Sequence, residues 1–165
     1  MDRGVIKVAD TNGVYVIKMS GDVRLTLSLS FDDFINEMFA NANYYSVIFD
    51  LSEAEAVDST TLGLMAKISL LGRAKDYMDP IIIATSRGMQ RLLLSMGFDE
   101  IFQIVESADT APGEYRELNS DDNQISEDAV REKVLEAHKT LIDLNENNHE
   151  TFKELIQSLE NYDLK

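Results

Sequence analysis

Three hydroxyl residues in a row follow an acid in the sequence Val57-Asp58-Ser59-Thr60-Thr61-Leu62-Gly63. An apolar run precedes them, Val47-Ile48-Phe49-Asp50-Leu51, and the residues after them have the spacing of an amphipathic helix. A strand is therefore expected to end here and a helix to begin. A serine at such a junction is commonly the N-cap of the helix. The hydroxyls either cap this helix or form a functional surface at its start, and the sequence pattern leaves both interpretations open.

Strand and helix patterns alternate on both sides of this junction. Asn12-Gly13 predicts a hairpin turn between the first two strands, because both residues tolerate the positive φ that such turns require. Alternation of this kind predicts an α/β fold, with helices packed against a sheet. The strands are predicted over 5–9, 14–19, 45–51, 81–84 and 101–105, and the helices from Ser30 or Asp32 to about Ala42, over 60–77, and from Ser86 to Gly97.

The pattern changes after the last predicted strand. We expect residues 1–106 to form the domain, 107–125 a linker, and 126–165 an acidic helical tail, either one long helix or a helical hairpin. Residues 107–165 contain 6 basic and 15 acidic residues. An apolar stripe that includes Val134, Ala137 and Leu141 has to be buried on the domain, on the tail itself or on a partner.

The composition argues against several classes of function. The 165 residues carry a formal net charge of −15, which repels phosphate backbones and anionic membrane surfaces, so we expect protein partners and no nucleic acid. The apolar runs are too short to span a membrane, and no signal peptide is recognisable. There are no cysteines, which favours the cytoplasm weakly.

Signals of catalysis are few. The two histidines, His138 and His149, lie in the polar tail, and we interpret both as solvated surface residues because their spacing suits neither a metal site nor a triad. The eight glycines form no phosphate-binding loop. We therefore expect no enzyme, no catalytic residue, no metal and no cofactor.

The start of the central helix nevertheless suits a covalent phosphate. Free backbone N–H groups and the positive end of the helix dipole tolerate a dianion there, so phosphorylation of Ser59 need not unfold the helix. Close to two added negative charges would join Glu53, Glu55 and Asp58 on one edge. A protein docked there through apolar or acidic contacts would be repelled, which is the behaviour of a binary switch.

These same residues carry a resemblance to a known family. The segment Asp58 to Gly63 after the strand at Val47 to Leu51 resembles the signature of STAS domains, the anti-sigma factor antagonists of bacteria. The resemblance covers about residues 5–106, including the Asn12-Gly13 turn. It implies a STAS-like single mixed sheet of about four to five strands with helices packed against it, here followed by a C-terminal helical extension.

The resemblance also implies a function and a site. Members of the family are cytoplasmic regulators without catalysis that bind an anti-sigma factor, and the anti-sigma factor, acting as a serine kinase, phosphorylates the serine after the aspartate. A metal-dependent serine/threonine phosphatase reverses the reaction. By position the acceptor is Ser59, and the partner-binding surface comprises Asp58, Thr60, Thr61 and Gly63. Thr61 departs from the family, since many members have Gly or Ala there.

Two further expectations stay open. The chain could instead be a constitutive STAS adaptor subunit of a transporter or signalling scaffold, with Ser59 only a helix cap. Its C-terminal helix could serve in self-association or modulate the binding of partners. Neither alternative can be decided from the residue pattern, and the downstream output of the pathway stays open with them.

Overall fold

The computed structural model describes residues 3–108, 114–118 and 126–162. It contains one mixed sheet of six strands in the order β5-β4-β3-β2-β1-β6. Strands β2 to β5 run parallel to one another, while β1 pairs antiparallel with both β2 and β6. The strands are β1 Val5–Thr11, β2 Val14–Val23, β3 Ser46–Val57, β4 Ile81–Ile83, β5 Gln103–Val105 and β6 Arg116–Leu118. The predicted single mixed sheet is confirmed, with six strands in place of four to five.

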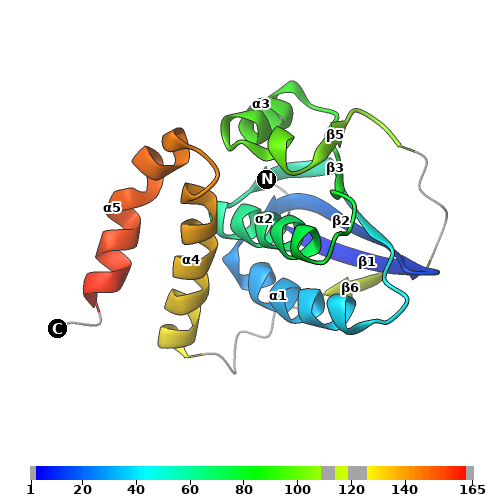
Figure 1. The fold of residues 1–165 in the computed structure, drawn as a ribbon, viewed down its shortest axis with the longest axis horizontal. Coiled ribbons are helices and arrows are strands. Elements are labelled where there is room, and N and C mark those ends of the chain that lie inside the picture. Colours follow the sequence, from blue (N-terminus) through cyan, green and yellow to red (C-terminus); the bar gives the residue numbers. More distant parts are fainter. Residues whose placement is uncertain (1–2, 109–113, 119–125, 163–165) are drawn as a thin grey trace.

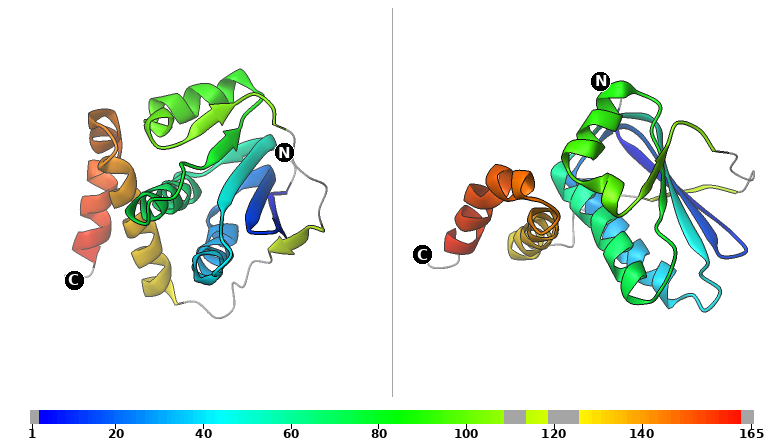
Figure 2. Two further views of the ribbon diagram at one scale, coloured as in Figure 1. Left: turned by 45° about the vertical axis from the view of Figure 1, so that its right-hand side comes forward. Right: turned by 45° about the horizontal axis from the view of Figure 1, so that its top comes forward.

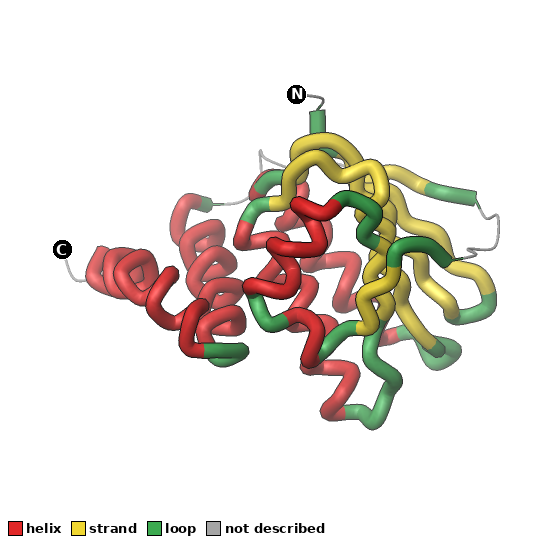
Figure 3. The backbone as a smooth tube through the Cα atoms, turned by 90° about the horizontal axis from the view of Figure 1, so that it is seen from above, coloured by secondary structure: helices red, strands yellow, loops and turns green. Residues whose placement is uncertain are grey.

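The helices gather on one side of this sheet, as Figure 3 shows. A second pair of helices lies outside them, so the molecule has three layers in Figure 2: the sheet, then α1 to α3, then α4 and α5. The helices are α1 Leu25–Ala40, α2 Ser59–Ala74, α3 Arg87–Ser95, the short 3₁₀ helix η1 Phe98–Glu100, α4 Glu127–Ile142 and α5 Glu146–Tyr162. Figure 1 shows α4 and α5 running side by side in opposite directions, which is the hairpin form of the predicted tail.

The hairpin between β1 and β2 follows the predicted turn. Asn12 and Gly13 both have positive φ, 53° and 87°. Gly13 is needed for a second reason, because a Cβ there would overlap the carbonyl oxygen of Asn43. The Gly13 backbone amide donates a hydrogen bond to the Asp10 carboxylate, with 3.0 Å between the nitrogen and Oδ1.

Strands β2 and β3 continue to Val23 and Val57, beyond the predicted ends at residues 19 and 51. Two other elements differ more from the sequence expectation. Helix α1 begins at Leu25, five residues before Ser30, so the predicted caps at Ser30 and Asp32 lie inside the helix. Leucine favours helix strongly enough to outweigh the weak alternation of residues 25–29. Strand β6 lies within the predicted linker 107–125 and adds an antiparallel edge to β1 through the pair Lys7 and Glu117.

The core lies between the sheet and the inner helices. Its largest fully buried side chains come from β1 to β3, α1, α2 and η1, among them Phe31, Phe49 and Phe98. Leu141, Phe152 and Ile156 of α4 and α5 belong to the same apolar cluster. The stripe of the tail is therefore buried on the domain and within the hairpin, which decides between the three possibilities left by the sequence.

Candidate functional site

The start of α2 is held by β2, which pairs with the strand that leads into the helix. The Asp58 amide donates to the carbonyl oxygen of Val23 at the end of β2, with 3.0 Å between the atoms, which fixes the chain as β3 ends. The Asp58 carboxylate then accepts a hydrogen bond from the Thr61 amide at 2.9 Å. Asp58 is thus the N-cap of α2, because its side chain satisfies one of the amides that the first turn leaves free.

Ser59 is the first residue of α2 and does not cap it. Its hydroxyl instead lies 2.7 Å from Nε2 of His138, which belongs to α4. The other ring nitrogen, Nδ1, lies 2.7 Å from the carbonyl oxygen of Val134. A carbonyl oxygen can only accept, so Nδ1 carries a proton, and in the neutral imidazole Nε2 accepts the proton of the Ser59 hydroxyl.

The prediction that His138 is a solvated surface residue is wrong. Its side chain is 2% exposed, and its ring meets the Phe152 ring edge-on with 5.0 Å between centroids. His149 does lie at the surface, with a side chain that is 55% exposed. The signal that could have placed His138 is its position four residues after Val134 and next to Ala137, on the same stripe of the helix.

The residues predicted as a partner-binding surface are brought together at this helix start, but most are covered. Asp58 is half-buried, Thr60 is buried, and Thr61 has no exposed surface. Gly63 is buried against α4, because a Cβ built on it would lie 2.7 Å from the Cβ of Ala137. The backbone of α4 therefore lies directly against Gly63.

The chemistry available at this site is that of an oxygen nucleophile beside an anion-binding turn. The Ser59 hydroxyl donates its proton to an imidazole nitrogen, which leaves its lone pairs for an electrophile such as a phosphoryl group. The first amides of α2 point outward from the helix start and favour negative charge. Together these groups suit the acceptance of a phosphate.

Acidic side chains lie along the strand that leads to the site and on the helix that packs against it. Glu53 and Glu55 are exposed at the end of β3. Glu53 lies 3.4 Å from the ammonium group of Lys18. The neighbouring part of α4 contributes Glu136, whose carboxylate lies 2.7 Å from Nζ of Lys67 on α2. A phosphate at Ser59 would therefore add charge to a region that already contains several acids.

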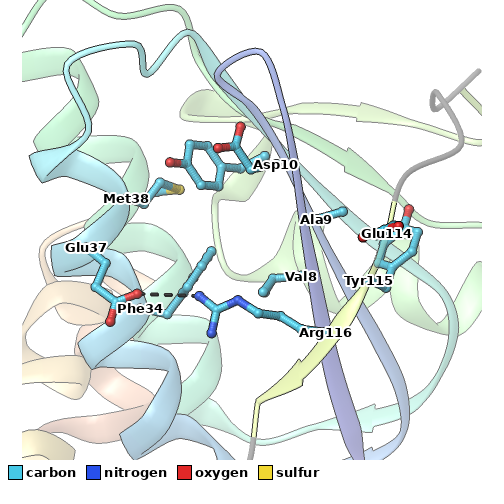
Figure 4. A pocket seen from close by; sticks show the side chains of 10 residues that line it. Val8, Ala9, Asp10, Phe34, Glu37, Met38, Glu114, Tyr115 and Arg116 are labelled. Atoms are coloured by element: carbon cyan, nitrogen blue, oxygen red, sulfur yellow. Dashed lines mark hydrogen bonds and ion pairs between the residues drawn. The ribbon is translucent and has the colours of Figure 1, made fainter.

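A cavity of about 460 Å³ lies elsewhere, between β1, α1 and β6. Figure 4 shows Arg116 extending from β6 over the ring of Phe34 toward Glu37, with 3.4 Å between Nη2 and the carboxylate. The lining residues Val8 to Asp10 lie opposite the first half of β2, whereas Ser59 follows the pairing of Val23 with Val57 at its other end. The cavity and Ser59 therefore lie at opposite ends of the sheet.

The described residues contain neither a cluster of metal ligands nor a membrane-spanning helix. Within residues 3–108, 114–118 and 126–162, no three His, Cys, Asp or Glu side chains gather closely enough to hold a metal ion. In the part of the chain that the structure describes, none of the helices has the length and apolar character needed to cross a lipid bilayer.

Known proteins resemble this chain in sequence and in fold. The sequence model of the STAS domain matches residues 5–111. The anti-sigma-F factor antagonist RsfB of Mycobacterium tuberculosis, found in two strains, is 28% identical over 104 residues, which is 62% of this chain and 82% of that protein. The NMR structure of the protein TM1081 superposes with a TM-score of 0.54 at 18% identity, covering 61% of this chain and 79% of that one.

The structural likeness concerns the fold alone at this level of identity. The family model, by contrast, spans β1 to β5 together with α1, α2 and α3, and so includes the start of α2 with Ser59. Helices α4 and α5 lie outside the matched residues. The chain therefore belongs to the STAS domain family.

Proposed function

We propose that this protein is an anti-sigma factor antagonist whose binding is switched by phosphorylation of Ser59. In its unmodified form it sequesters an anti-sigma factor that is also a serine kinase, within a bacterial partner-switching pathway. Phosphorylation by that kinase ends the interaction, and a serine/threonine phosphatase restores it. The kinase uses ATP, so the switch would act in the cytoplasm. The protein's own role is binding, without catalysis.

The observation that carries this proposal is that the Ser59 hydroxyl does not cap α2. Asp58 caps α2, so Ser59 is not required to do so, and its hydroxyl points away from the helix backbone toward a side chain of another element. A serine that served only as a cap would have its oxygen engaged by an amide of the first turn. The resemblance of the chain to a relative named as an anti-sigma-F factor antagonist supports the same role.

Electrostatics support the direction of the switch. A phosphoserine carries close to two negative charges at neutral pH. Here it would stand beside Asp58, at the end of a strand that carries the exposed Glu53 and Glu55. A partner that docks at this edge through apolar or acidic groups would lose affinity by charge repulsion and by the cost of burying the dianion.

The test is to incubate the purified chain with ATP and candidate anti-sigma kinases of its own organism, and to locate phosphate by tandem mass spectrometry. We expect phosphate on Ser59 and none after Ser59→Ala. Ser86→Ala is the matched control, because Ser86 also stands at a helix start but caps it. Phosphate found only at other residues would contradict the proposal.

A binding measurement then tests the switch itself. The kinase that modifies Ser59 is expected to bind Ser59→Ala as it binds the parent chain, and to bind Ser59→Asp at least about tenfold more weakly because of the added charge. Equal affinity for Ser59→Ala and Ser59→Asp would mean that the domain is a constitutive adaptor.

A further inference from the structure

Helix α4 lies directly across the start of α2, where the proposed switch acts. Figures 1 and 2 show α4 beside α2 and on the side away from the sheet. The approach is close enough that Gly63 has no room for a side chain, since its Cβ would lie 2.7 Å from the Cβ and the carbonyl carbon of Ala137. A foreign protein cannot contact Gly63 unless α4 moves away.

Ser59 is half-buried, and the same helix lies against its hydroxyl. Its hydroxyl is 2.7 Å from Nε2 of His138, and the His138 side chain is 2% exposed. Phosphorylation places a phosphorus and three oxygens on the Ser59 oxygen. The imidazole fills the space next to that oxygen on the α4 side, so a kinase that transfers phosphate along this direction has to displace α4.

The hairpin is fixed to the domain at more than one place. Lys67 and Glu136 form an ion pair of 2.7 Å between α2 and α4. In the first turn of α5, the Asn148 side-chain amide donates to the carbonyl oxygens of Met96 after α3 and Leu141 of α4, at 2.8 and 2.9 Å. Asn148 is 1% exposed. These contacts hold α4 in one register on α2.

We infer that the α4–α5 hairpin is an internal competitor that occupies the partner-binding surface and masks Ser59. The inference rests on the proposed function, because it places both the kinase and the partner at Ser59. In the closed state α4 covers Ser59 and Gly63, and in the open state the hairpin leaves this surface. Only the open state accepts the kinase or the partner.

Charge makes the two states mutually exclusive once Ser59 is modified. Residues 107–165 hold 15 acidic and 6 basic side chains, and Glu136 is close to the docking surface. A phosphate on Ser59 would need the space that the imidazole fills and would add charge on the side where α4 carries Glu136, so the hairpin could not return to its present position. By linkage, each ligand of the open state raises the fraction of open molecules, and a closed state favoured about a hundredfold lowers the apparent affinity for the partner by about the same factor.

Accessibility of position 59 can be measured directly, because the chain contains no cysteine. In the Ser59→Cys variant of the full chain, polyethylene glycol maleimide is expected to react slowly. Adding Ala137→Glu places a charge against α2 and is expected to raise the initial rate at least about tenfold. Gln157→Glu adds the same charge at an exposed position of α5 and is expected to change the rate less than about twofold.

Two controls protect this measurement. Ser86→Cys, with and without Ala137→Glu, reports whether the variant disturbs the domain in general, and its rate is expected to stay constant. Leu141→Ala offers a second way to weaken docking without burying a charge, because Leu141 is fully buried on the tail. If position 59 reacts equally fast in the parent background, in Ala137→Glu and in Leu141→Ala, the closed state is overturned.

The final experiment measures whether opening the hairpin changes the rate of phosphorylation at Ser59. The kinase that modifies Ser59 is expected to phosphorylate Ala137→Glu at least about tenfold faster than the parent chain, with Gln157→Glu unchanged. Faster maleimide labelling without faster phosphorylation would overturn the role of the hairpin as a gate. If no kinase modifies Ser59 in any variant, the proposed function fails, while the labelling still decides whether α4 covers this position.

Discussion

Helices α2 and α3 both begin shortly after a parallel strand of the sheet, and both have a serine at the junction. In α3 the serine is the cap: Oγ of Ser86 accepts a hydrogen bond from the Met89 amide at 3.1 Å. In α2 the preceding residue, Asp58, takes that position, and Ser59 becomes the first residue of the helix. The serine therefore stands one position later in α2 than in α3. As a result, the Ser86 hydroxyl caps its own helix, whereas the Ser59 hydroxyl bonds a side chain of another helix.

The two helices also differ in what lies outside them. Gly63 in α2 has the backbone of Ala137 against it, whereas a Cβ on Gly88 in α3 would meet no atom within 4 Å. Helix α2 is thus buried on both sides, by the sheet and by α4, while the outer face of α3 stays open near its start. The hydroxyl that does not cap its own helix, that of Ser59, therefore lies on the helix that the tail covers.

The largest effect on stability is expected from substituting the two glycines, because only Gly63 is in contact with α4. Gly63→Ala forces a methyl group into the Ala137 contact and is expected to lower the free energy of unfolding by about 1–3 kcal/mol. Gly88→Ala is the matched control and is expected to leave it unchanged or raise it by up to about 1 kcal/mol, since alanine favours helix. Urea denaturation followed by circular dichroism measures both. Equal stabilisation by the two substitutions would show that α4 does not press on α2.

An intermediate effect on stability is expected from removing the N-cap side chains, Asp58 of α2 and Ser86 of α3. Asp58→Ala and Ser86→Ala are each expected to cost about 1 kcal/mol of stability, because each leaves an amide of a first turn unsatisfied. Asp58→Asn retains an acceptor and is expected to stay within a few tenths of a kcal/mol of the parent chain. The same denaturation experiment applies. A larger loss from Ser59→Ala than from Asp58→Ala, in a chain whose tail is already opened by Ala137→Glu, would contradict Asp58 as the cap.

The smallest expected effect concerns the far end of α2. Arg73 forms two hydrogen bonds with Asp79, at 2.8 and 2.9 Å, and this contact lowers the pKa of the Asp79 carboxyl below its ordinary value of 3.8. A lowered pKa in the folded state means that the stabilisation is complete above the ordinary value and is lost as the pH falls through the lowered one. Both side chains are partly exposed, so the contribution is expected to stay below about 1 kcal/mol.

The measurement for this pair is the difference in stability between the parent chain and Asp79→Asn at a series of pH values. The difference is expected to be constant near neutral pH and to shrink toward zero as the pH falls below the ordinary value for aspartate. The effect of Ser86→Ala should not change over the same range, because a hydroxyl does not titrate there. A gap that grew on acidification would contradict the ion pair as its source.

Several parts of the fold could be predicted because their signals are local. The Asn12-Gly13 turn, the cap at Ser86, the end of α3 at Gly97 and the cap of α4 at Ser126 all follow from residues within one turn of each other. The acid at Asp58 was equally visible, yet propensity alone does not decide whether Asp58 or Ser59 becomes the N-cap. That choice depends on where β3 ends, and the bond from Asp58 to Val23 sets that end.

The misjudged elements are those whose partners lie far along the chain. Strand β6 pairs with β1 through residues more than a hundred positions apart, so nothing in its short sequence marked it as a strand. His138 lies 79 residues from Ser59, and its polarity suggested solvent. Its burial becomes reasonable only with both ring nitrogens bonded, since a buried polar group without partners would be costly.

The sequence by itself determined the alternating α/β order, the hairpin turn, the helical tail and the serine at the start of α2, because periodicity, turn residues and caps act over a few residues. Tertiary structure alone decided that Asp58 would cap, that the tail would fold back onto α2, and that His138 would meet Ser59. The last two outcomes depend on where the apolar stripe of α4 is buried. The sequence pattern shows that the stripe must be buried, but it does not show against which surface.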